Sequence, residues 1–167
     1  MNGQKIQRLV PRSFFVTSGV GIDSEQAVAF DLALCDAGIS ECNLVAVSSI
    51  LPARAEEVAR SDVTLTPGEI THCVISRAEG MSGEVIGAGI GYGWLGAEGR
   101  FGIICEHHGH YTREYLMEKL KEKLHKMAET RISDIEIKID RMKLEMRSVE
   151  VEDGKFGSVV VALVFVL

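Results

Sequence analysis

The amino-acid sequence predicts an α+β fold in which sheets and helices form separate layers. Most of the chain consists of consecutive strand-like segments, about seven or eight in number, whereas only two segments have the periodicity of helices. Because so few helices connect the strands, a layered α+β sandwich is favoured over a doubly wound parallel sheet. No repeat, low-complexity tract or linker interrupts the 167 residues, which suits a single domain.

The first two strands and the first helix have recognisable boundaries. Residues 13–19, SFFVTSG, form a strand. Asp23, followed three residues later by Gln26 as in a capping box, starts a helix. Gly38 ends this helix, because a residue without a Cβ suits a left-handed C-cap. The apolar residues 43–51, NLVAVSSIL, form the next strand.

The second half of the chain contains one helix and the remaining strands. Residues 112–129 place leucine and methionine side chains on one stripe of a helix, so this helix should pack on a sheet. The other segments alternate or concentrate apolar residues as strands do. These strands are predicted at residues 70–76, 83–94, 101–108, 133–140, 143–152 and 156–167.

Charge, cysteines and hydropathy exclude several classes of protein. The formal net charge is −6 and Lys and Arg are not clustered to neutralise phosphates, so nucleic acid is not an expected partner. The four cysteines have no C-x-x-C spacing and the N-terminus lacks the apolar core of a signal peptide, which predicts a reduced, cytoplasmic protein. The longest apolar run, residues 159–167, is far shorter than the roughly 20 residues of a membrane span, so no membrane contact is expected.

One carboxylate interrupts the apolar side of the first helix. On a helical wheel, Asp31 falls in the middle of an arc of alanine, valine, leucine, phenylalanine and cysteine side chains. A carboxylate that faces a core is costly unless a cation or hydrogen-bond donors meet it. Its partner could be an Arg or Lys of this chain or of a neighbouring subunit, or a cationic ligand, and the pattern leaves these alternatives open.

A second unusual carboxylate, Glu106, ends the apolar strand FGIIC. It either caps the strand in contact with solvent or acts as a general acid whose pKa is raised by apolar neighbours. His107, His108 and His110 follow it, but successive side chains of a strand point to opposite faces and do not converge easily on one ion. No metal site is therefore predicted.

Two adjacent serines, Ser48 and Ser49, lie between Val47 and Ile50 in the apolar segment 43–51, just before a proline. From the pattern alone, two hydrogen-bonded strand serines are the simpler interpretation, because unpartnered buried hydroxyls are costly. A serine can also attack the peptide bond on its N-terminal side and form an ester. Elimination and hydrolysis then leave a pyruvoyl group at a new N-terminus. The oxyanion of the first step needs a donor, such as Asn43 or a backbone N–H.

Two segments together resemble the pyruvoyl-dependent arginine decarboxylases. They are FDLALCDAGISECNLVAVSSILP, residues 30–52, and GIICEHHGHYTREYLMEKL, residues 102–120. The resemblance implies self-cleavage between Ser48 and Ser49, which divides the domain into a β subunit of residues 1–48 and an α subunit of residues 49–167. It also implies a four-layer αββα sandwich, and a homo-oligomer that is a trimer of αβ units with active sites between neighbours.

The resemblance further implies a role for each candidate residue. Ser49 would become the covalent pyruvoyl cofactor, the electron sink for the loss of CO2 from L-arginine, with agmatine as the product. Glu106 would return a proton to the α-carbon, and Asp31 would bind the guanidinium group. Asn43 would polarise the Ser48 carbonyl during processing or orient the substrate.

Two alternatives to arginine decarboxylation stay open at this point. The same cofactor could act on another basic amino acid, because a single carboxylate such as Asp31 also suits an ammonium group. The chain could instead be an oligomeric binding protein that is never cleaved.

Overall fold

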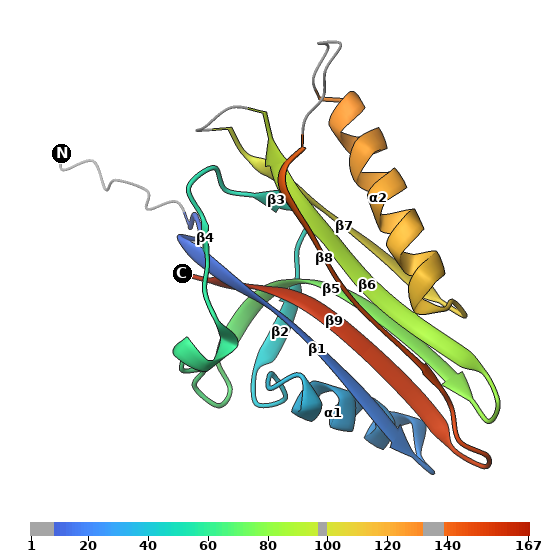
Figure 1. The fold of residues 1–167 in the computed structure, drawn as a ribbon. Coiled ribbons are helices and arrows are strands. Elements are labelled where there is room, and N and C mark those ends of the chain that lie inside the picture. Colours follow the sequence, from blue (N-terminus) through green and yellow to red (C-terminus); the bar gives the residue numbers. More distant parts are fainter. Residues whose placement is uncertain (1–8, 97–99, 132–138) are drawn as a thin grey trace.

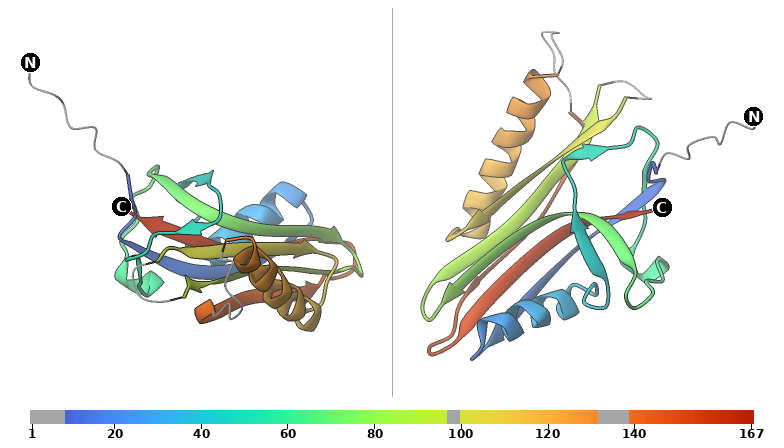
Figure 2. Two further views of the ribbon diagram at one scale, coloured as in Figure 1. Left: turned by 90° about the horizontal axis from the view of Figure 1, so that it is seen from above. Right: turned by 180° about the vertical axis from the view of Figure 1, so that it is seen from behind.

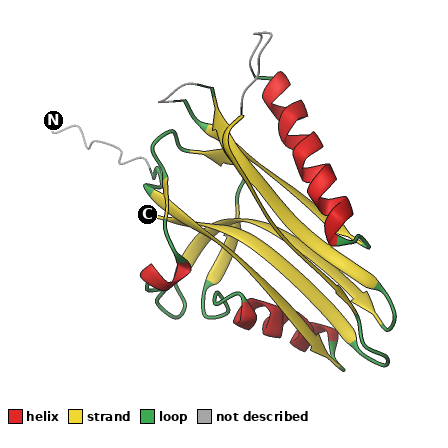
Figure 3. Cartoon of the chain, viewed as in Figure 1, coloured by secondary structure: helices red, strands yellow, loops and turns green. Residues whose placement is uncertain are grey.

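A computed structural model describes residues 9–96, 100–131 and 139–167, which form nine strands, two α-helices and a short 3₁₀ turn (Figures 1 and 3). The strands are β1 (Ser13–Asp23), β2 (Asn43–Ala46), β3 (Ile50–Leu51), β4 (Glu56–Glu57), β5 (Ile70–Met81), β6 (Val85–Leu95), β7 (Gly102–Gly109), β8 (Ile139–Glu150) and β9 (Phe156–Val166). The helices are α1 (Gln26–Asp36) and α2 (Arg113–Glu129), and the turn is η1 (Arg60–Asp62).

The strands form two sheets. Five strands in the order β2-β5-β9-β1-β4 make one sheet, and four strands in the order β3-β7-β6-β8 make the other. Most pairs are antiparallel, whereas the β1/β4 and β2/β5 pairs are parallel. The predicted α+β class, with strands that mostly follow one another along the chain, is therefore confirmed.

A buried cluster draws side chains from both sheets. Phe14 of β1 meets the ring of Tyr92 of β6 edge to face, with the ring centroids 5.6 Å apart. Ile90 of β6 and Val161 of β9 belong to the same cluster and have no exposed surface. Each such aliphatic side chain stabilises the fold by about 1.5–3 kcal/mol relative to leaving it in water. The contact between the sheets is thus the largest apolar core of the described chain.

Polar contacts join β8 to the other sheet at one edge of this core. The Ser18 hydroxyl of β1 donates a hydrogen bond to the Glu145 carboxylate at 2.8 Å. The Lys143 ammonium lies 2.6 Å from the Glu57 carboxylate of β4. Exposed ion pairs of this kind contribute little stability individually, but they fix how one sheet edge lies beside the other.

The first helix packs on the five-stranded sheet through its smallest side chains. Ala29 and Ala33 of α1 are fully buried, and the helix contacts β1 and β9. A Cβ built on Gly21 of β1 would lie 2.0 Å from the Ala29 carbonyl oxygen, far inside van der Waals contact. The helix can therefore approach the strand this closely only because residue 21 has no side chain.

The second helix packs on the four-stranded sheet through a leucine stripe. Leu116, Leu120 and Leu124 of α2 are fully buried, as the sequence pattern predicts. Their methyl groups lie over Gly87, Gly89 and Gly91, and a Cβ on each glycine would come within 2.8–2.9 Å of the leucine above it. The glycine series of β6 thus makes room for the helix. In Figure 2 the two helices lie on opposite sides of the strands.

The observed elements differ from the predicted ones in several places. Strand β1 continues past its predicted end at residue 19 to Asp23, and β8 begins at Ile139, before the strand predicted at 143–152. The predicted strand at residues 43–51 is two short strands, β2 and β3, which belong to different sheets. Helix α1 has Glu25 at its N-cap and no side-chain cap, because Asp23 is the last residue of β1 and accepts the Glu25 N–H instead. Most of the strand predicted at 133–140 lies outside the described residues. Neither described helix has the length and apolar character needed to cross a bilayer.

The contact between Gly21 and α1 makes a stability prediction. Gly21→Ala should force α1 away from β1 and destabilise the fold by about 2 kcal/mol, as overpacking of a core does. A melting temperature roughly 5 °C below that of the wild type is expected in a thermal unfolding experiment. Ser24→Ala, at an exposed position just beyond β1, is the control and should melt with the wild type. Equal melting temperatures for both variants would contradict the packing described here.

Candidate active site

The serine pair lies where the chain crosses from one sheet to the other. Residues 47–49 connect β2 in the five-stranded sheet to β3 in the four-stranded sheet. Ser48 is exposed and Ser49 is half-buried. Neither hydroxyl group makes a hydrogen bond to any residue that the structure describes. The interpretation of the pair as strand serines whose hydroxyls are hydrogen-bonded within the protein is therefore wrong for the part of the chain that the structure describes.

The backbone carbonyls of both serines accept hydrogen bonds. The Ile50 N–H donates to the Ser48 carbonyl at 3.2 Å, which closes a three-residue turn centred on Ser49. The Ile104 N–H of β7 donates to the Ser49 carbonyl at 2.9 Å. Donors at these positions withdraw electron density from the carbonyl carbons and stabilise negative charge on the oxygens. The Ser48 carbonyl carbon is the atom that the Ser49 hydroxyl would attack.

Strand pairing brings Ser49 to Glu106. Strand β3 pairs antiparallel with β7, with Ile50 opposite Ile103, so Ser49 lies beside Ile104 and two residues from Glu106. The two predicted residues share the wall of one cavity of about 340 Å³. That cavity is lined by Ser49, Ile104, Cys105, Glu106, Lys123, Lys126 and Met127.

Helix α2 supplies the opposite wall of the cavity. The Lys123 ammonium donates to the backbone carbonyl of Glu106 at 2.8 Å, and this contact links the helix to the end of β7. Glu106 itself is half-buried. Burial raises the pKa of the neighbouring Cys105 thiol to about 12, so it stays protonated and is a poor nucleophile at neutral pH.

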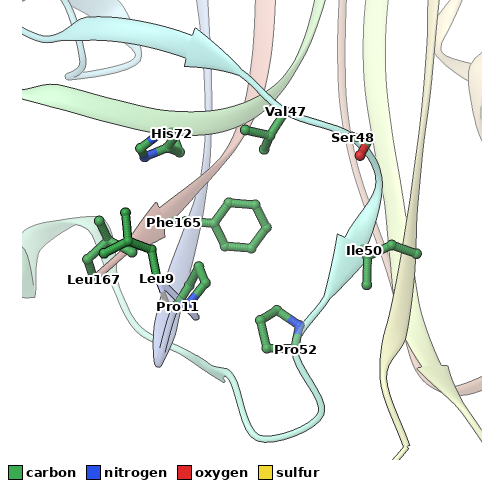
Figure 4. Close-up of a pocket in the computed structure, with 9 residues that line it drawn as sticks. All are labelled: Leu9, Pro11, Val47, Ser48, Ile50, Pro52, His72, Phe165 and Leu167. Atoms are coloured by element: carbon green, nitrogen blue, oxygen red, sulfur yellow. The ribbon is translucent and has the colours of Figure 1, made fainter. Parts of the chain in front are cut away.

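A second cavity, of about 240 Å³, lies on the Ser48 side of the crossing (Figure 4). Its wall is mostly apolar and includes Phe165 near the C-terminus, with His72 of β5 as the one titratable side chain that lines it. The lining residues are Leu9, Pro11, Val47, Ser48, Ile50, Pro52, His72, Phe165 and Leu167. The serine pair therefore separates an apolar cavity from one that contains a carboxylate and two lysines.

Asn43 lies away from the serine pair within its own chain. It begins β2, and its side-chain amide donates to the Gly68 carbonyl at 2.9 Å. Five residues of extended chain separate it from Ser48, a span of roughly 16 Å. Within one chain, the donor that the structure gives to the Ser48 carbonyl is the Ile50 N–H and not Asn43.

Asp31 also lies away from the cavity, and the expectation that it faces the core is wrong. It is exposed on α1 and forms no ion pair with any described residue. One side of the apolar arc around it is exposed as well, with Val28 at 43% and Leu32 at 39% of their full accessible surface, whereas Phe30 and Leu34 on the other side are half-buried. The helix turns its alanines, not this arc, toward the sheet, because only they fit against Gly21. The arc is thus an apolar surface with a carboxylate at its centre.

Neighbours in β7, His107 and His108 differ in their surroundings: His107 is half-buried and stacks on Tyr111, with ring centroids 5.0 Å apart, whereas His108 is exposed. His110, which follows the strand, lies 3.3 Å from Glu84. Burial lowers the pKa of His107, so its ring is neutral at pH 7. No group of three metal-ligating side chains occurs in the part of the chain that the structure describes.

Sequence reasoning missed the lysine and the two backbone donors of this site. The helical pattern assigned Lys123 to the solvent-exposed charged residues that surround the leucine stripe of residues 112–129. The Ile50 and Ile104 amides have no sequence signal, because their role follows from the pairing of β3 with β7. The one sequence signal is the position of Lys123, three residues after Leu120 and next to Leu124, which indicates that the methylene groups of its side chain lie near the sheet.

Comparisons with known proteins show which family this chain is similar to. The family model described as pyruvoyl-dependent arginine decarboxylase matches residues 13–167. Pyruvoyl-dependent arginine decarboxylase 1 of Methanosarcina acetivorans is 34% identical over 166 residues, which cover 97% of this chain and 99% of the relative. The pyruvoyl-dependent arginine decarboxylase of Methanocella arvoryzae is 38% identical over 167 residues, covering 96% and 99%. Pyruvoyl-dependent arginine decarboxylase 2 of Archaeoglobus fulgidus is 40% identical over 106 residues, covering 62% and 68%.

The match extends over almost the whole chain and includes the serine pair, the end of β7 and both helices. The chain therefore belongs to the pyruvoyl-dependent arginine decarboxylase family.

Proposed function

We propose that this protein cleaves its own chain between Ser48 and Ser49 and then decarboxylates L-arginine to agmatine and CO2. The observation that carries the proposal is the serine pair itself. Its hydroxyls are unpartnered among the described residues, its first carbonyl accepts the Ile50 N–H, and Ser49 shares a cavity with Glu106. This combination places a free hydroxyl, a carbonyl polarised by an N–H donor and a carboxylic acid around one peptide bond, as self-cleavage requires.

The cleavage begins when the Ser49 hydroxyl adds to the Ser48 carbonyl carbon. The Ile50 N–H stabilises the oxyanion, the bond to the Ser49 nitrogen breaks, and an ester joins the two residues. Loss of the Ser49 α-proton then expels the ester as a carboxylate on Ser48. This elimination leaves dehydroalanine at residue 49, and a proton moves to its β-carbon to give the imine tautomer. Hydrolysis of the imine consumes one water, releases ammonia and leaves a ketone at residue 49.

The residues around Ser49 fit a pyruvoyl group. The Ile104 N–H already donates to the Ser49 carbonyl at 2.9 Å, and this oxygen lies next to the new ketone. When present, the group supplies a carbonyl that takes up the substrate's α-amine and accepts electrons as CO2 leaves. Glu106, on the same cavity wall, returns a proton to the α-carbon. The half-buried position of Glu106 limits competing water.

The mature enzyme consists of residues 1–48 and 49–167 in a single cytoplasmic domain. Its layers are α1, the five-stranded sheet, the four-stranded sheet and α2, the order of a four-layer αββα sandwich. Three such units assemble with active sites between neighbours. Two observations support the assembly: the exposed apolar arc around Asp31, and the distance of Asn43 from the cavity of its own chain.

Arginine is the substrate that the site chemistry and the names of the relatives both favour. The carboxylate of Asp31, presented by a neighbouring unit, binds the guanidinium group through two parallel hydrogen bonds. Asn43 of the same neighbour orients the substrate. The site therefore selects an amino acid with a long cationic side chain, and the α-carbon of this substrate lies at residue 49.

The first prediction concerns self-cleavage. Purified wild-type protein should give two fragments under denaturing mass spectrometry, whereas Ser49→Ala should remain one chain of 18.2 kDa without activity, because the attacking oxygen is gone. Ser61→Ala removes an exposed hydroxyl of η1 and should be cleaved like the wild type. Two fragments from Ser49→Ala would contradict the mechanism.

The second prediction concerns proton return. Glu106→Gln should fold and keep its side-chain volume, but turnover should fall by roughly 10²–10⁴-fold, the contribution of a positioned acid. Agmatine formation is measured on protein whose cleavage has been checked by mass. Glu118→Gln, on the exposed side of α2, serves as the matched control. Near-normal turnover by Glu106→Gln would assign the proton to another group.

The third prediction separates arginine from other basic amino acids. CO2 release should be much faster from arginine than from lysine, ornithine or histidine, because only a guanidinium group makes a bidentate pair with one carboxylate. Asp31→Asn should raise the KM for arginine by at least tenfold. Equal turnover of lysine and arginine by the wild type would refute the role of Asp31.

A further inference from the structure

Lys123 brings a positive charge into the cavity that contains Ser49 and Glu106. Its stem is half-buried on α2, and its ammonium group donates to the Glu106 carbonyl at 2.8 Å. The cavity wall includes both the lysine and the serine that cleavage would convert. Neither charge pattern nor helical periodicity assigns a function to this residue.

The ammonium group of Lys123 has a different kind of partner from those of the neighbouring lysines on the helix. Lys119 and Lys126 both bind the Glu122 carboxylate and lower its pKa to about 2, so these charges are neutralised on the surface. Lys123 has no carboxylate within ion-pair distance among the described residues, and its hydrogen-bond acceptor is a neutral carbonyl. A half-buried ammonium group without a counter-ion attracts an anion.

We propose that Lys123 binds the α-carboxylate of the amino-acid substrate. The inference rests on the proposed function, in which residue 49 takes up the α-amine. Because amine and carboxylate are attached to the same carbon atom, the carboxylate must enter the same cavity. Its volume of about 340 Å³ is sufficient for the head of an amino acid. The substrate is thus bound at both ends, by Lys123 at the carboxylate and by Asp31 of a neighbour at the guanidinium group.

The kinetic consequence follows from the reaction itself. The carboxylate is anionic in the bound substrate and becomes neutral CO2, so its contact with Lys123 is stronger in the ground state than in the transition state. Such a contact lowers KM and does not raise kcat. A lysine that only held the Glu106 backbone in place would have the opposite signature, because its loss would misplace the acid and lower kcat.

The test compares ligands with and without a carboxylate on the processed enzyme. Agmatine has the guanidinium and amine groups only, whereas 5-guanidinopentanoate has the guanidinium and carboxylate groups and cannot react at residue 49. In isothermal titration calorimetry, Lys123→Met should raise the Kd of 5-guanidinopentanoate at least tenfold, which corresponds to about 1.4 kcal/mol. The Kd of agmatine should stay within twofold of the wild-type value. The KM for arginine should rise by a similar factor.

Two variants control this experiment. Lys123→Arg keeps the charge and should retain most of the affinity for 5-guanidinopentanoate. Lys121→Met removes an exposed charge of α2 outside the cavity and should change the affinity for neither ligand. If Lys123→Met does not fold, Lys123→Gln provides the same comparison. Equal losses for both ligands, or a fall in kcat at unchanged KM, would overturn the inference. A wild-type protein that is uncleaved and inactive on arginine would instead overturn the proposed function.

Discussion

The pairing of β3 with β7 is the constraint on which the site depends. Two residues, Ile50 and Leu51, leave the five-stranded sheet and join the edge of the four-stranded one. This short ladder turns the Ser48 carbonyl toward the Ile50 N–H and the Ser49 carbonyl toward the Ile104 N–H. It also places Ser49 beside Ile104, so that Glu106, the one carboxylate of β7, lines the same cavity as the serine. Without the crossing, the serines would alternate along an ordinary strand with their carbonyls in a regular ladder.

Local patterns predicted the elements whose packing is local. The leucine stripe of α2 faces the four-stranded sheet as expected, and the long apolar segment before the C-terminus is the buried strand β9. Residues 43–51 were predicted as one strand because hydrophobicity cannot distinguish a continuous strand from two that change sheets. The change of sheet arises from pairing partners far away in the chain, at residues 70–73 and 102–103.

Helix α1 illustrates a different limit of sequence patterns. A helical wheel identifies an apolar arc, but it does not tell which partner covers that arc. In the structure the sheet is covered by Ala29 and Ala33, since the missing Cβ of Gly21 lets the backbone approach. Of the larger side chains around Asp31, Val28 and Leu32 stay exposed. For the site, the sequence singled out Ser49 and Glu106, which the structure brings to the wall of one cavity. It did not predict that Asp31 would be exposed, because a helical wheel does not show which face meets the sheet.

The position of β1 has a consequence for a chain cut after residue 48. Strand β1 pairs with β9 along eleven residues and also carries β4, and β2 is hydrogen-bonded to β5. The N-terminal fragment thus contributes an internal strand, the helix packed on it and an edge strand. A nick at the crossing breaks one covalent bond and no ladder. After such a cut the two pieces would remain one folding unit, a complemented pair that separates only when the sheet itself unfolds.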